Sequence, residues 1–405
     1  MPLTRNDLAR LDAADPLAGH RDAFDLPEGV IYLDGNSLGA MPRSVPGRMS
    51  RTLGTEWRTG LIRSWRGPEG WMTLPHRVGD AIAGLIGAQA GEVVVADSTS
   101  VNLFKLLAAA LAMRPDRRTI LTEADNFPTD IYMAQGLARL LGDRAHLKVA
   151  KRADLAASLD DDTAVLTLTH VDYRTAEIHD MAGLTRRAHD KGALVLWDLA
   201  HSAGAVPVDL NGAHADLAVG CGYKYLNGGP GAPAYLFVAR RHQDELTQPL
   251  SGWLGHEAPF AFEPGYRPAS GIARALCGTP PVLSLSALEE GVATVAAAGM
   301  PALRAKSMAL TQRFIELVEQ ECPGLTLFSP RDAERRGSQV SFRHPRAEAV
   351  MEGLIAEGVI GDLRMPDVLR FGFAPLYLRF VDLWDAVAVL KRVATAIDAR
   401  GAAAS

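Results

Sequence analysis

Two stretches of this 405-residue chain decide its fold: ALVLWDLAHS at residues 193–202 and LAVGCGYKY at residues 217–225. In each stretch a short apolar run gives way to polar residues, which is typical of a buried strand that opens into a loop. The first run ends at Asp198 and the second leads to Lys224. We expect both side chains at the carboxyl edge of a parallel sheet, where α/β proteins bind their ligands.

The chain on either side repeats this pattern. Apolar runs predict strands at 93–96, 119–122, 164–168, 193–197, 217–220 and 234–238, and helices are predicted at 101–113, 129–141 and 181–191. Continuous apolar strands that alternate with helices predict an α/β fold, with a mostly parallel sheet covered by helices on both faces.

The length of the chain favours more than one domain, because a single core rarely grows this large. Residues 1–45 look irregular. After about residue 282, a long helical region to 321, interrupted at Gly299-Met300-Pro301, precedes predicted strands at 339–343 and 369–373 and a helix at 381–397. We therefore predict an N-terminal segment at 1–45, a large ligand-binding domain at 46–285 and a smaller C-terminal α+β domain at 286–405.

The composition is that of a soluble globular protein, with 48% hydrophobic and 22% charged residues. The net charge of −5 gives no support to nucleic acid or an anionic membrane as a partner. The three cysteines form neither a disulfide framework nor a zinc-binding spacing, so no metal site is expected and the cytoplasm is the simplest location. No run approaches the roughly 18 apolar residues of a membrane span. The motifs of P-loop, dinucleotide-binding, zinc-protease and serine-hydrolase sites are missing.

Lys224 and Asp198 suggest one kind of chemistry. A lysine can form a Schiff base with the aldehyde of pyridoxal phosphate, and a carboxylate can keep the pyridine nitrogen of that cofactor protonated. Tyr223 precedes the lysine, and Asn227-Gly228-Gly229 lets backbone approach a bulky ligand closely. Each residue alone has an ordinary alternative: a surface Lys224, an Asp198 bonded to strand-end amides, or a His201 packed in the core. Their combination favours a cofactor site.

Three other segments add candidate contacts. Residues 97–102 open a predicted helix directly after a strand, and free amides there favour a phosphate group, although ordinary capping gives the same pattern. Phe127, after the next strand, could stack on a planar ring or pack in the core, and Asp130 could accept a hydrogen bond. Arg370 could bind a substrate carboxylate through two parallel hydrogen bonds, with an ordinary surface arginine as the alternative.

Taken together, these residues resemble the kynureninase family, which consists of homodimeric pyridoxal phosphate enzymes with the aspartate aminotransferase fold (fold type I). The resemblance runs through most of the chain and rests on ordered blocks. These are 34–39, Trp65, 98–103, 126–130, 169–171, 197–202, 222–225, 251–253, 278–281, and Arg370 with 375–377.

The resemblance implies a role for each residue of the cofactor site. Lys224 forms the Schiff base, Asp198 pairs with the pyridine nitrogen and Phe127 stacks on the ring. The residues at further cofactor positions are Thr99, Ser100, Thr129, Asp130, Thr169, His201 and Tyr223. Trp253 and Thr279 resemble residues that reach the phosphate from a partner subunit, which implies a homodimer with shared active sites.

The resemblance also implies the reaction. Arg370 matches the arginine that binds the carboxylate of the amino acid, and Ser37 and Trp65 would border the aromatic end of the substrate. The enzyme would be a hydrolase that cleaves a carbon–carbon bond of a ketone, converting L-kynurenine, or 3-hydroxy-L-kynurenine, to anthranilate or its hydroxy form and L-alanine. Lys224 would take the Cα proton and Tyr223 would protonate the alanine fragment. Such an enzyme acts in tryptophan catabolism or NAD biosynthesis.

The nearest alternative is another enzyme of the same fold, such as a cysteine desulfurase or a class V aminotransferase. These enzymes typically stack a histidine on the ring, where this chain offers Phe127, and a desulfurase needs a nucleophilic cysteine on a mobile loop, which the setting of Cys322 does not suggest. A ligand-sensing regulator would need an N-terminal DNA-binding domain, for which 1–45 is too short. A pseudoenzyme would not need Lys224 together with its acid and arginine.

Overall fold

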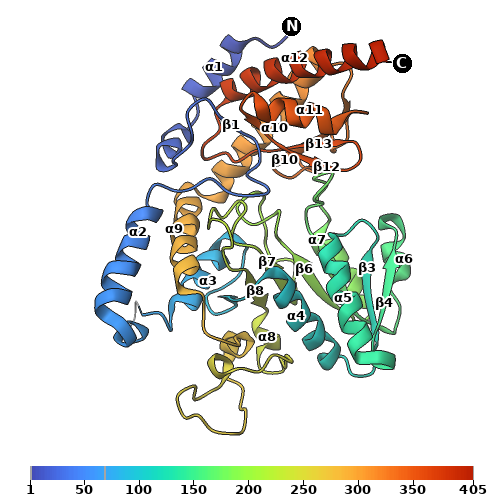
Figure 1. Ribbon diagram of the computed structural model, residues 1–405. Helices are drawn as coiled ribbons and strands as arrows, with labels where there is room; N and C mark the ends of the chain where they lie inside the picture. Colours follow the sequence, from blue (N-terminus) through green and yellow to red (C-terminus); the bar gives the residue numbers. More distant parts are fainter. Residues whose placement is uncertain (1, 68–69, 405) are drawn as a thin grey trace.

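The computed structural model describes residues 2–67 and 70–404, and a seven-stranded sheet forms its centre (Figure 1). The strand order is β2-β8-β7-β6-β5-β3-β4. The strands are β2 (Val93–Val95), β3 (Thr119–Glu123), β4 (His146–Ala150), β5 (Thr163–Thr169), β6 (Leu194–Asp198), β7 (Leu217–Gly220) and β8 (Tyr235–Val238). Strands β7, β6, β5, β3 and β4 are parallel to one another, whereas β8 is antiparallel to β2 and β7. The predicted mostly parallel α/β fold is confirmed.

Helices cover both faces of this sheet, and β6 shows how. Successive side chains of a strand point to opposite faces. Val195 and Trp197 belong to one buried cluster, with residues of α3 (Leu74–Leu85), α7 (Met181–Asp190) and α9 (Val282–Ala298). Leu194 and Leu196 belong to the other, with residues of α4 (Thr99–Met113) and α5 (Pro128–Leu141). Because both faces are buried, β6 is apolar along its length rather than alternating.

The C-terminal part is built on a four-stranded antiparallel sheet with the order β12-β13-β10-β9. Its strands are β9 (Thr326–Leu327), β10 (Gln339–Arg343), β12 (Asp362–Arg364) and β13 (Val368–Gly372), and its helices are α10 (Met300–Glu321), α11 (Ala347–Ala356) and α12 (Phe380–Ala404). The helical region after 282 is divided as predicted, because α9 and α10 bend by 83° around Gly299. Gly299 has φ 77°, which glycine adopts readily.

The expectation of an irregular segment at 1–45 is wrong. Helix α1 (Arg5–Ala13) is regular, and β1 (Ile31–Tyr32) pairs in parallel with β11 (Val359–Ile360). A capping box starts α1, in which the side chains of Thr4 and Asp7 each accept a bond from the other's backbone amide. Only Leu8 of this helix is buried, so its apolar periodicity is too weak to predict it. Helix α1 packs on α12, and both ends of the chain lie on the outer side of the C-terminal part, near these two helices (Figure 1).

The remaining elements are short and connect those above. They are η1 (Ala18–Ala23), α2 (Val45–Arg51), η2 (Thr52–Gly60), η3 (Leu61–Trp65), η4 (Gly142–Arg144), η5 (Arg152–Asp154), α6 (Leu155–Ser158), α8 (Arg240–Gln243), η6 (Trp253–Gly255) and η7 (Gly271–Ala275). Within the described ranges no single helix is long and apolar enough to cross a membrane; α9 and α10 pass that test only as a bent pair.

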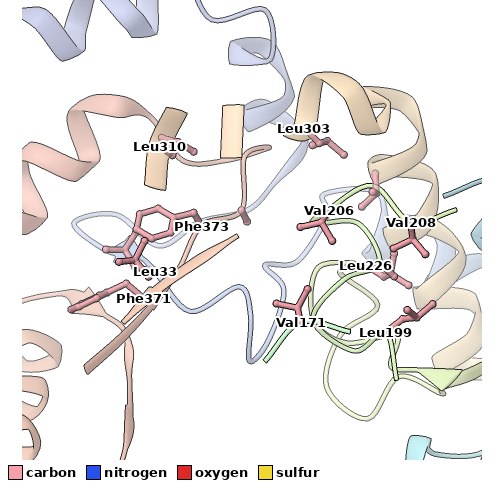
Figure 2. Close-up of a cluster of buried hydrophobic side chains, with 14 of the residues drawn as sticks. Leu33, Val171, Leu199, Val206, Val208, Leu226, Leu303, Leu310, Phe371 and Phe373 are labelled. Carbon is pink, nitrogen blue, oxygen red and sulfur yellow. The ribbon is translucent and has the colours of Figure 1, made fainter. Parts of the chain in front are cut away.

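One apolar cluster joins the segments around the carboxyl edge of the central sheet (Figure 2). Leu33 comes from the N-terminal segment, Val171 and Leu199 from the loops after β5 and β6, and Phe371 and Phe373 from β13 and the residue after it. Burial of apolar surface stabilises such a junction by roughly 25 cal/mol per Å². The strand-end loops of the central sheet are thereby held against the C-terminal sheet.

Candidate active site

Lys224 lies in the loop after β7, at the carboxyl edge of the central sheet. Its Nζ is 3.0 Å from Nε2 of His201, which comes from the loop after β6. The lysine loop is closed by its own backbone, since the amide of Asn227 donates to the carbonyl of Lys224 and the amide of Gly228 to that of Gly222, both at 2.9 Å. The parallel pairing of β6 with β7 thus brings the lysine and the histidine together.

The N-terminal segment contacts the lysine loop at Gly39. The amide of Gly39 donates to the carbonyl of Tyr223 at 2.7 Å. A Cβ atom at Gly39 would lie 2.4 Å from the carbonyl oxygen of Lys224, and backbone atoms cannot move aside easily. Only glycine fits here, so the loop at 34–39 forms one wall of the site.

Two buried carboxylates form the acidic part of the site: Asp198 at the end of β6 and Asp130 in the first turn of α5. Asp198 accepts a hydrogen bond from the amide of Ala200 at 2.8 Å, and Oγ1 of Thr169 lies 3.4 Å from Oδ2 of Asp130. Burial raises the pKa of Asp198, while the charge of Lys224 opposes the rise. Burial and the charge of Asp198 raise the pKa of Asp130 well above its usual value.

This arrangement of charges fits pyridoxal phosphate. A protonated pyridine nitrogen would supply the positive charge that two adjacent buried carboxylates need in addition to Lys224. Nδ1 of His201 is buried and makes no hydrogen bond of ordinary geometry in the part of the chain that the structure describes, although the side chain of Gln339 is near enough to affect the pKa of His201. Burial, followed by the charge of Lys224, lowers the pKa of His201 well below its usual value. The imidazole is therefore neutral, with one donating and one accepting nitrogen.

Phe127 is placed to cover a planar ring beside Lys224. The lysine Nζ lies 5.9 Å from the ring centroids of both Phe127 and Tyr223. The side-chain oxygen of Asn126 holds the backbone beside Phe127 in place, because it accepts hydrogen bonds from the amide of Phe127 at 2.9 Å and from Oγ1 of Thr169 at 2.5 Å. The rings of Tyr173 and Phe127 pack nearly perpendicular to each other, with their centroids 5.1 Å apart. The aromatic wall is thus held by hydrogen bonds from two neighbouring strand ends.

The proposed phosphate positions lie at helix N-termini. Thr99 and Ser100 begin α4, which Ser98 caps by accepting from the amide of Val101 at 3.3 Å, and Thr129 lies in the first turn of α5. Such termini present free amides that bind anions. A cavity of about 370 Å³ opens here, lined among others by Ser98, Tyr223 and Thr279. Thr279 therefore lines a cavity near the start of α4 in its own chain.

Arg370, on β13, is buried at the other end of the site with only 1% of its surface exposed. Its Nε donates to Oδ1 of Asp362 at 2.7 Å, and its Nη2 donates to the second oxygen of that carboxylate. Nη1 donates to the carbonyl of Tyr173 at 2.7 Å and Nη2 to Oγ of Ser37 at 2.9 Å. Ser37 therefore contacts the arginine that sequence analysis assigned to the substrate carboxylate.

Trp65 and Trp253 lie together in a separate aromatic cluster. The ring of Trp65 is 5.6 Å from Trp71 and 6.2 Å from Trp253, which in turn is 5.9 Å from Phe260. Among the described residues, no ring contact joins this cluster to Phe127. One chain thus brings most of the predicted cofactor residues together but leaves Trp65 and Trp253 outside that group.

Sequence reasoning missed Asp362, Arg364 and the role of Tyr173. Asp362 is the direct cross-strand partner of Arg370 in the antiparallel register of β12 and β13. Opposite charges commonly pair at such positions. β12 is only three residues long, with one apolar residue between two charged ones, so the sequence gives no sign of this register and the pairing is visible only in the structure.

The fold and the pairing of a strand-end lysine with a buried aspartate define a pyridoxal phosphate-dependent enzyme of fold type I. Among solved structures, the chain resembles a cysteine desulfurase from Thermococcus onnurineus NA1, with a TM-score of 0.79 and 21% identity over 98% of this chain and 100% of that one. It also resembles a mutant of C-DES with glycine covalently linked to the pyridoxal phosphate cofactor, with a TM-score of 0.78 and 16% identity over 96% and 100% of the two chains. At these identities the likeness concerns the fold alone.

Closer relatives narrow the class. A kynureninase of Burkholderia pseudomallei (strain 1106a) is 56% identical over 397 residues, which cover 96% of this chain and 95% of that protein. A kynureninase of Pseudomonas fluorescens is 54% identical over the same shares. Residues 303–390 match the profile of the kynureninase C-terminal domain. The chain belongs to the kynureninase family.

Proposed function

We propose that this chain hydrolyses L-kynurenine to anthranilate and L-alanine, with Lys224, Asp198 and Arg370 as its principal residues. The observation that carries this proposal is the position of Nζ of Lys224, 3.0 Å from the neutral imidazole of His201 and beside the buried carboxylates. The buried arginine of β13 lies at the same carboxyl edge, where it can take the charge of an amino acid. Membership of the kynureninase family supports the choice of substrate.

Each residue has a task that its surroundings support. Pyridoxal phosphate, held through Lys224, supplies a ring that withdraws electrons from the amino acid carbons. Asp198 and Asp130 would hold the proton of the pyridine nitrogen, and Phe127 would cover the ring. The freed amine of Lys224, positioned by Nε2 of His201, would accept the Cα proton.

Tyr223 is suited to give a proton back. The neighbouring Cys221 and burial raise the pKa of the Tyr223 hydroxyl above its usual value, so the phenol keeps its proton at neutral pH. Water adds to the γ-carbonyl carbon of the substrate and the Cβ–Cγ bond breaks. The water oxygen ends in the carboxylate of anthranilate, and Cβ of the alanine fragment takes a proton from Tyr223.

The buried thiols argue against desulfurase chemistry. A cysteine desulfurase needs an activated, accessible thiolate. Cys221 and Cys322 are buried, and burial raises the pKa of Cys221 and raises that of Cys322 to about 11, whereas Cys277 is only partly buried and lines the cavity beside Tyr223. Both buried thiols therefore stay protonated at neutral pH. Membership of the kynureninase family supports hydrolysis of a carbon–carbon bond over sulfur transfer.

The direct test mixes the cofactor-loaded protein with L-kynurenine and follows the fluorescence of anthranilate, with alanine measured separately. We expect both products in equal amounts, and a parallel assay with 3-hydroxy-L-kynurenine gives the preference between the two substrates. Production of alanine without anthranilate, or no product from protein that carries the Schiff-base absorbance, would overturn the proposal.

We further propose a cytoplasmic homodimer. Trp57, Leu61 and Ile62, in η2 and the turn of helix that follows it, are 55%, 57% and 77% exposed, which is unusual for large apolar side chains that lie close together in sequence. They neighbour a cavity of about 480 Å³ whose lining includes Trp57, Trp71 and Pro280. A second copy of the chain would cover this surface, and light scattering of the holoenzyme measures the assembly.

A further inference from the structure

Most of the hydrogen-bonding capacity of Arg370 is used inside the protein. A guanidinium has five N–H donors, and four of those of Arg370 point to Asp362, Tyr173 and Ser37. Within the described residues, a single Nη1–H is therefore left for a ligand. A substrate carboxylate has two oxygens and takes a bidentate pair of donors when it can, so Arg370 in this arrangement needs help from another donor.

A second guanidinium lies beside the same carboxylate. Nη2 of Arg364 is 2.9 Å from Oδ2 of Asp362, so Asp362 is shared by two arginines. Asp362 and Arg364 are separated by one residue on β12, and residues at this spacing point to the same face of a strand. The side chain of Arg364 is 33% exposed, in contrast to the buried side chain of Arg370. Arg364 is thus the more accessible of the two cations.

Arg364 also lies within electrostatic reach of the lysine site. After burial and Lys224, the charges of Arg370 and Arg364 contribute to lowering the pKa of His201. The group that opposes both arginines from the N-terminal loop is Asp34, whose pKa is raised to about 7 by burial and then by the charge of Asp362. When Asp34 is protonated, two arginines face one ionised carboxylate. The cluster then carries a net positive charge that suits one substrate carboxylate.

We propose that Arg364 is a second substrate-binding arginine, which takes the α-carboxylate of the amino acid together with Arg370, while Asp362 holds the two guanidinium groups side by side. This inference rests on the proposed function, in which Arg370 binds that carboxylate. It adds a residue from β12 to the site and makes Asp362 a positioning residue rather than a ligand of the substrate.

The test compares kcat and KM for L-kynurenine among variants of the holoenzyme. Arg364→Gln should raise KM about tenfold, as expected for loss of one charge-assisted contact, with little change in kcat. Arg364→Lys keeps the positive charge but loses the planar guanidinium group, so its KM should lie between those of the original enzyme and Arg364→Gln. Arg343→Gln, in β10 of the same sheet, is the matched control and should leave KM unchanged.

Two further measurements separate binding from structure. The double variant Asp362→Asn with Arg364→Gln keeps the net charge of the pocket but removes the second arginine and the carboxylate that holds Arg370, so its KM should stay at least as high as that of Arg364→Gln. Kynurenamine, which lacks the α-carboxylate, should inhibit the original enzyme and Arg364→Gln with the same Ki. An unchanged KM in Arg364→Gln, a KM restored by charge balance in the double variant, or a weakened Ki for kynurenamine in Arg364→Gln would each overturn the role of Arg364.

Arg370→Gln distinguishes failure of this inference from failure of the proposed function. Its KM should rise about a hundredfold, because the buried donor set is lost. If Arg370→Gln raises KM and Arg364→Gln does not, Arg370 binds the carboxylate alone and the inference fails by itself. If neither variant changes KM, the assignment of this end of the site to the substrate carboxylate fails as well.

Discussion

Nζ of Lys224 and Nε2 of His201 are 3.0 Å apart, although the two residues follow different strands of the central sheet. Because burial, then the charge of Lys224, lowers the pKa of His201 far below its usual value, the imidazole stays neutral beside the lysine. A neutral ring can accept a hydrogen bond from the amine without adding a second positive charge. The pair therefore orients the reactive amine, and the charge of Lys224 in turn opposes the rise in the pKa of the buried Asp198.

Replacement of this lysine tests the centre of the site. Lys224→Ala should lower turnover of L-kynurenine by at least about a thousandfold, because both covalent attachment and the base for the Cα proton are lost. The visible absorbance of the Schiff base should disappear, which a spectrum of the purified protein measures. Lys151→Ala, on the surface before η5, is the control and should leave both unchanged. Normal turnover in Lys224→Ala would show that Lys224 is not the residue that binds the cofactor and accepts the Cα proton.

The carboxylate at the end of β6 should matter through its charge. Asp198→Asn retains an oxygen that can accept from the amide of Ala200, so the loop should fold normally. The variant cannot hold the pyridine nitrogen protonated, and we expect kcat to fall by about a hundredfold or more. Steady-state kinetics with saturating cofactor measure this loss. Asp161→Asn, exposed in the loop before β5, is the matched control, and equal kinetics for the two variants would contradict the assignment.

Subunit mixing tests the homodimer and the position of Thr279. Lys224→Ala and Thr279→Ala should each be weakly active alone. If Thr279 serves the site of a partner, mixed dimers of the two variants contain one intact site, and activity should rise towards about a quarter of the original on statistical mixing. Thr279 lines a cavity with Ser98 and Tyr223 of its own chain, so a site completed within one chain would show no gain. Refolding the two variants together and assaying anthranilate decides between these outcomes.

The close contact between the N-terminal loop and the lysine loop leaves no room for a methyl group at Gly39, so Gly39→Ala should disturb both loops. Gly39→Ala places a Cβ within 2.4 Å of the carbonyl oxygen of Lys224, so either loop must shift. We expect a loss of about 2 kcal/mol in the free energy of unfolding and a larger loss of turnover. Gly47→Ala, in α2 with nothing within 4 Å, should be neutral or slightly stabilising. Chemical denaturation and kinetics of both variants measure the difference.

Asp216 should give the protein an acid-sensitive source of stability. Burial opposes its ionisation, but hydrogen bonds from His189 at 2.7 Å and His242 at 2.8 Å, with others from Arg241 and the amide of Val195, outweigh burial and lower the pKa of Asp216. A depressed pKa contributes stability that is present above the unfolded value of about 3.9 and is lost as the pH falls further.

Asp216→Asn should accordingly destabilise the protein by about 2 kcal/mol at pH 7. The difference in the free energy of unfolding between the original protein and Asp216→Asn should become smaller below about pH 4, because protonation of Asp216 then removes the same charge from the original protein. Urea denaturation at a series of pH values measures this difference. A difference that stays constant down to about pH 3 would show that the side chain acts through shape rather than charge.

The central sheet could be predicted from sequence because its strands are buried on both faces. Runs such as 193–197 are apolar at every position, and each ends in a polar residue that marks the carboxyl edge. Parallel neighbours end at the same edge, so the proximity of Asp198 and Lys224 followed from the pattern alone.

The C-terminal end of the site could not be predicted in this way. Arg370 was expected to have its donors free for a substrate carboxylate, yet most of them bind groups of the protein, above all Asp362. This pairing depends on the register between β12 and β13, and a strand of three residues is too short to show a periodic pattern in the sequence. Helix α1 was missed since its stability comes from end capping and one buried leucine rather than from an apolar stripe. The pairing of β1 with β11 joins segments from opposite ends of the chain, which local patterns do not encode.

That pairing has a consequence for protein synthesis. Strand β1 leaves the ribosome early, but its partner β11 is made some three hundred residues later, and Ser37 meets Arg370 only after that. A nascent chain that stops after α9 already contains the lysine, the histidine and both carboxylates, yet it has no arginine for a substrate and no partner for its first strand. The residues proposed to hold the cofactor and those proposed to select the amino acid are therefore made at different times, and the second set is present only once β12 and β13 have been made.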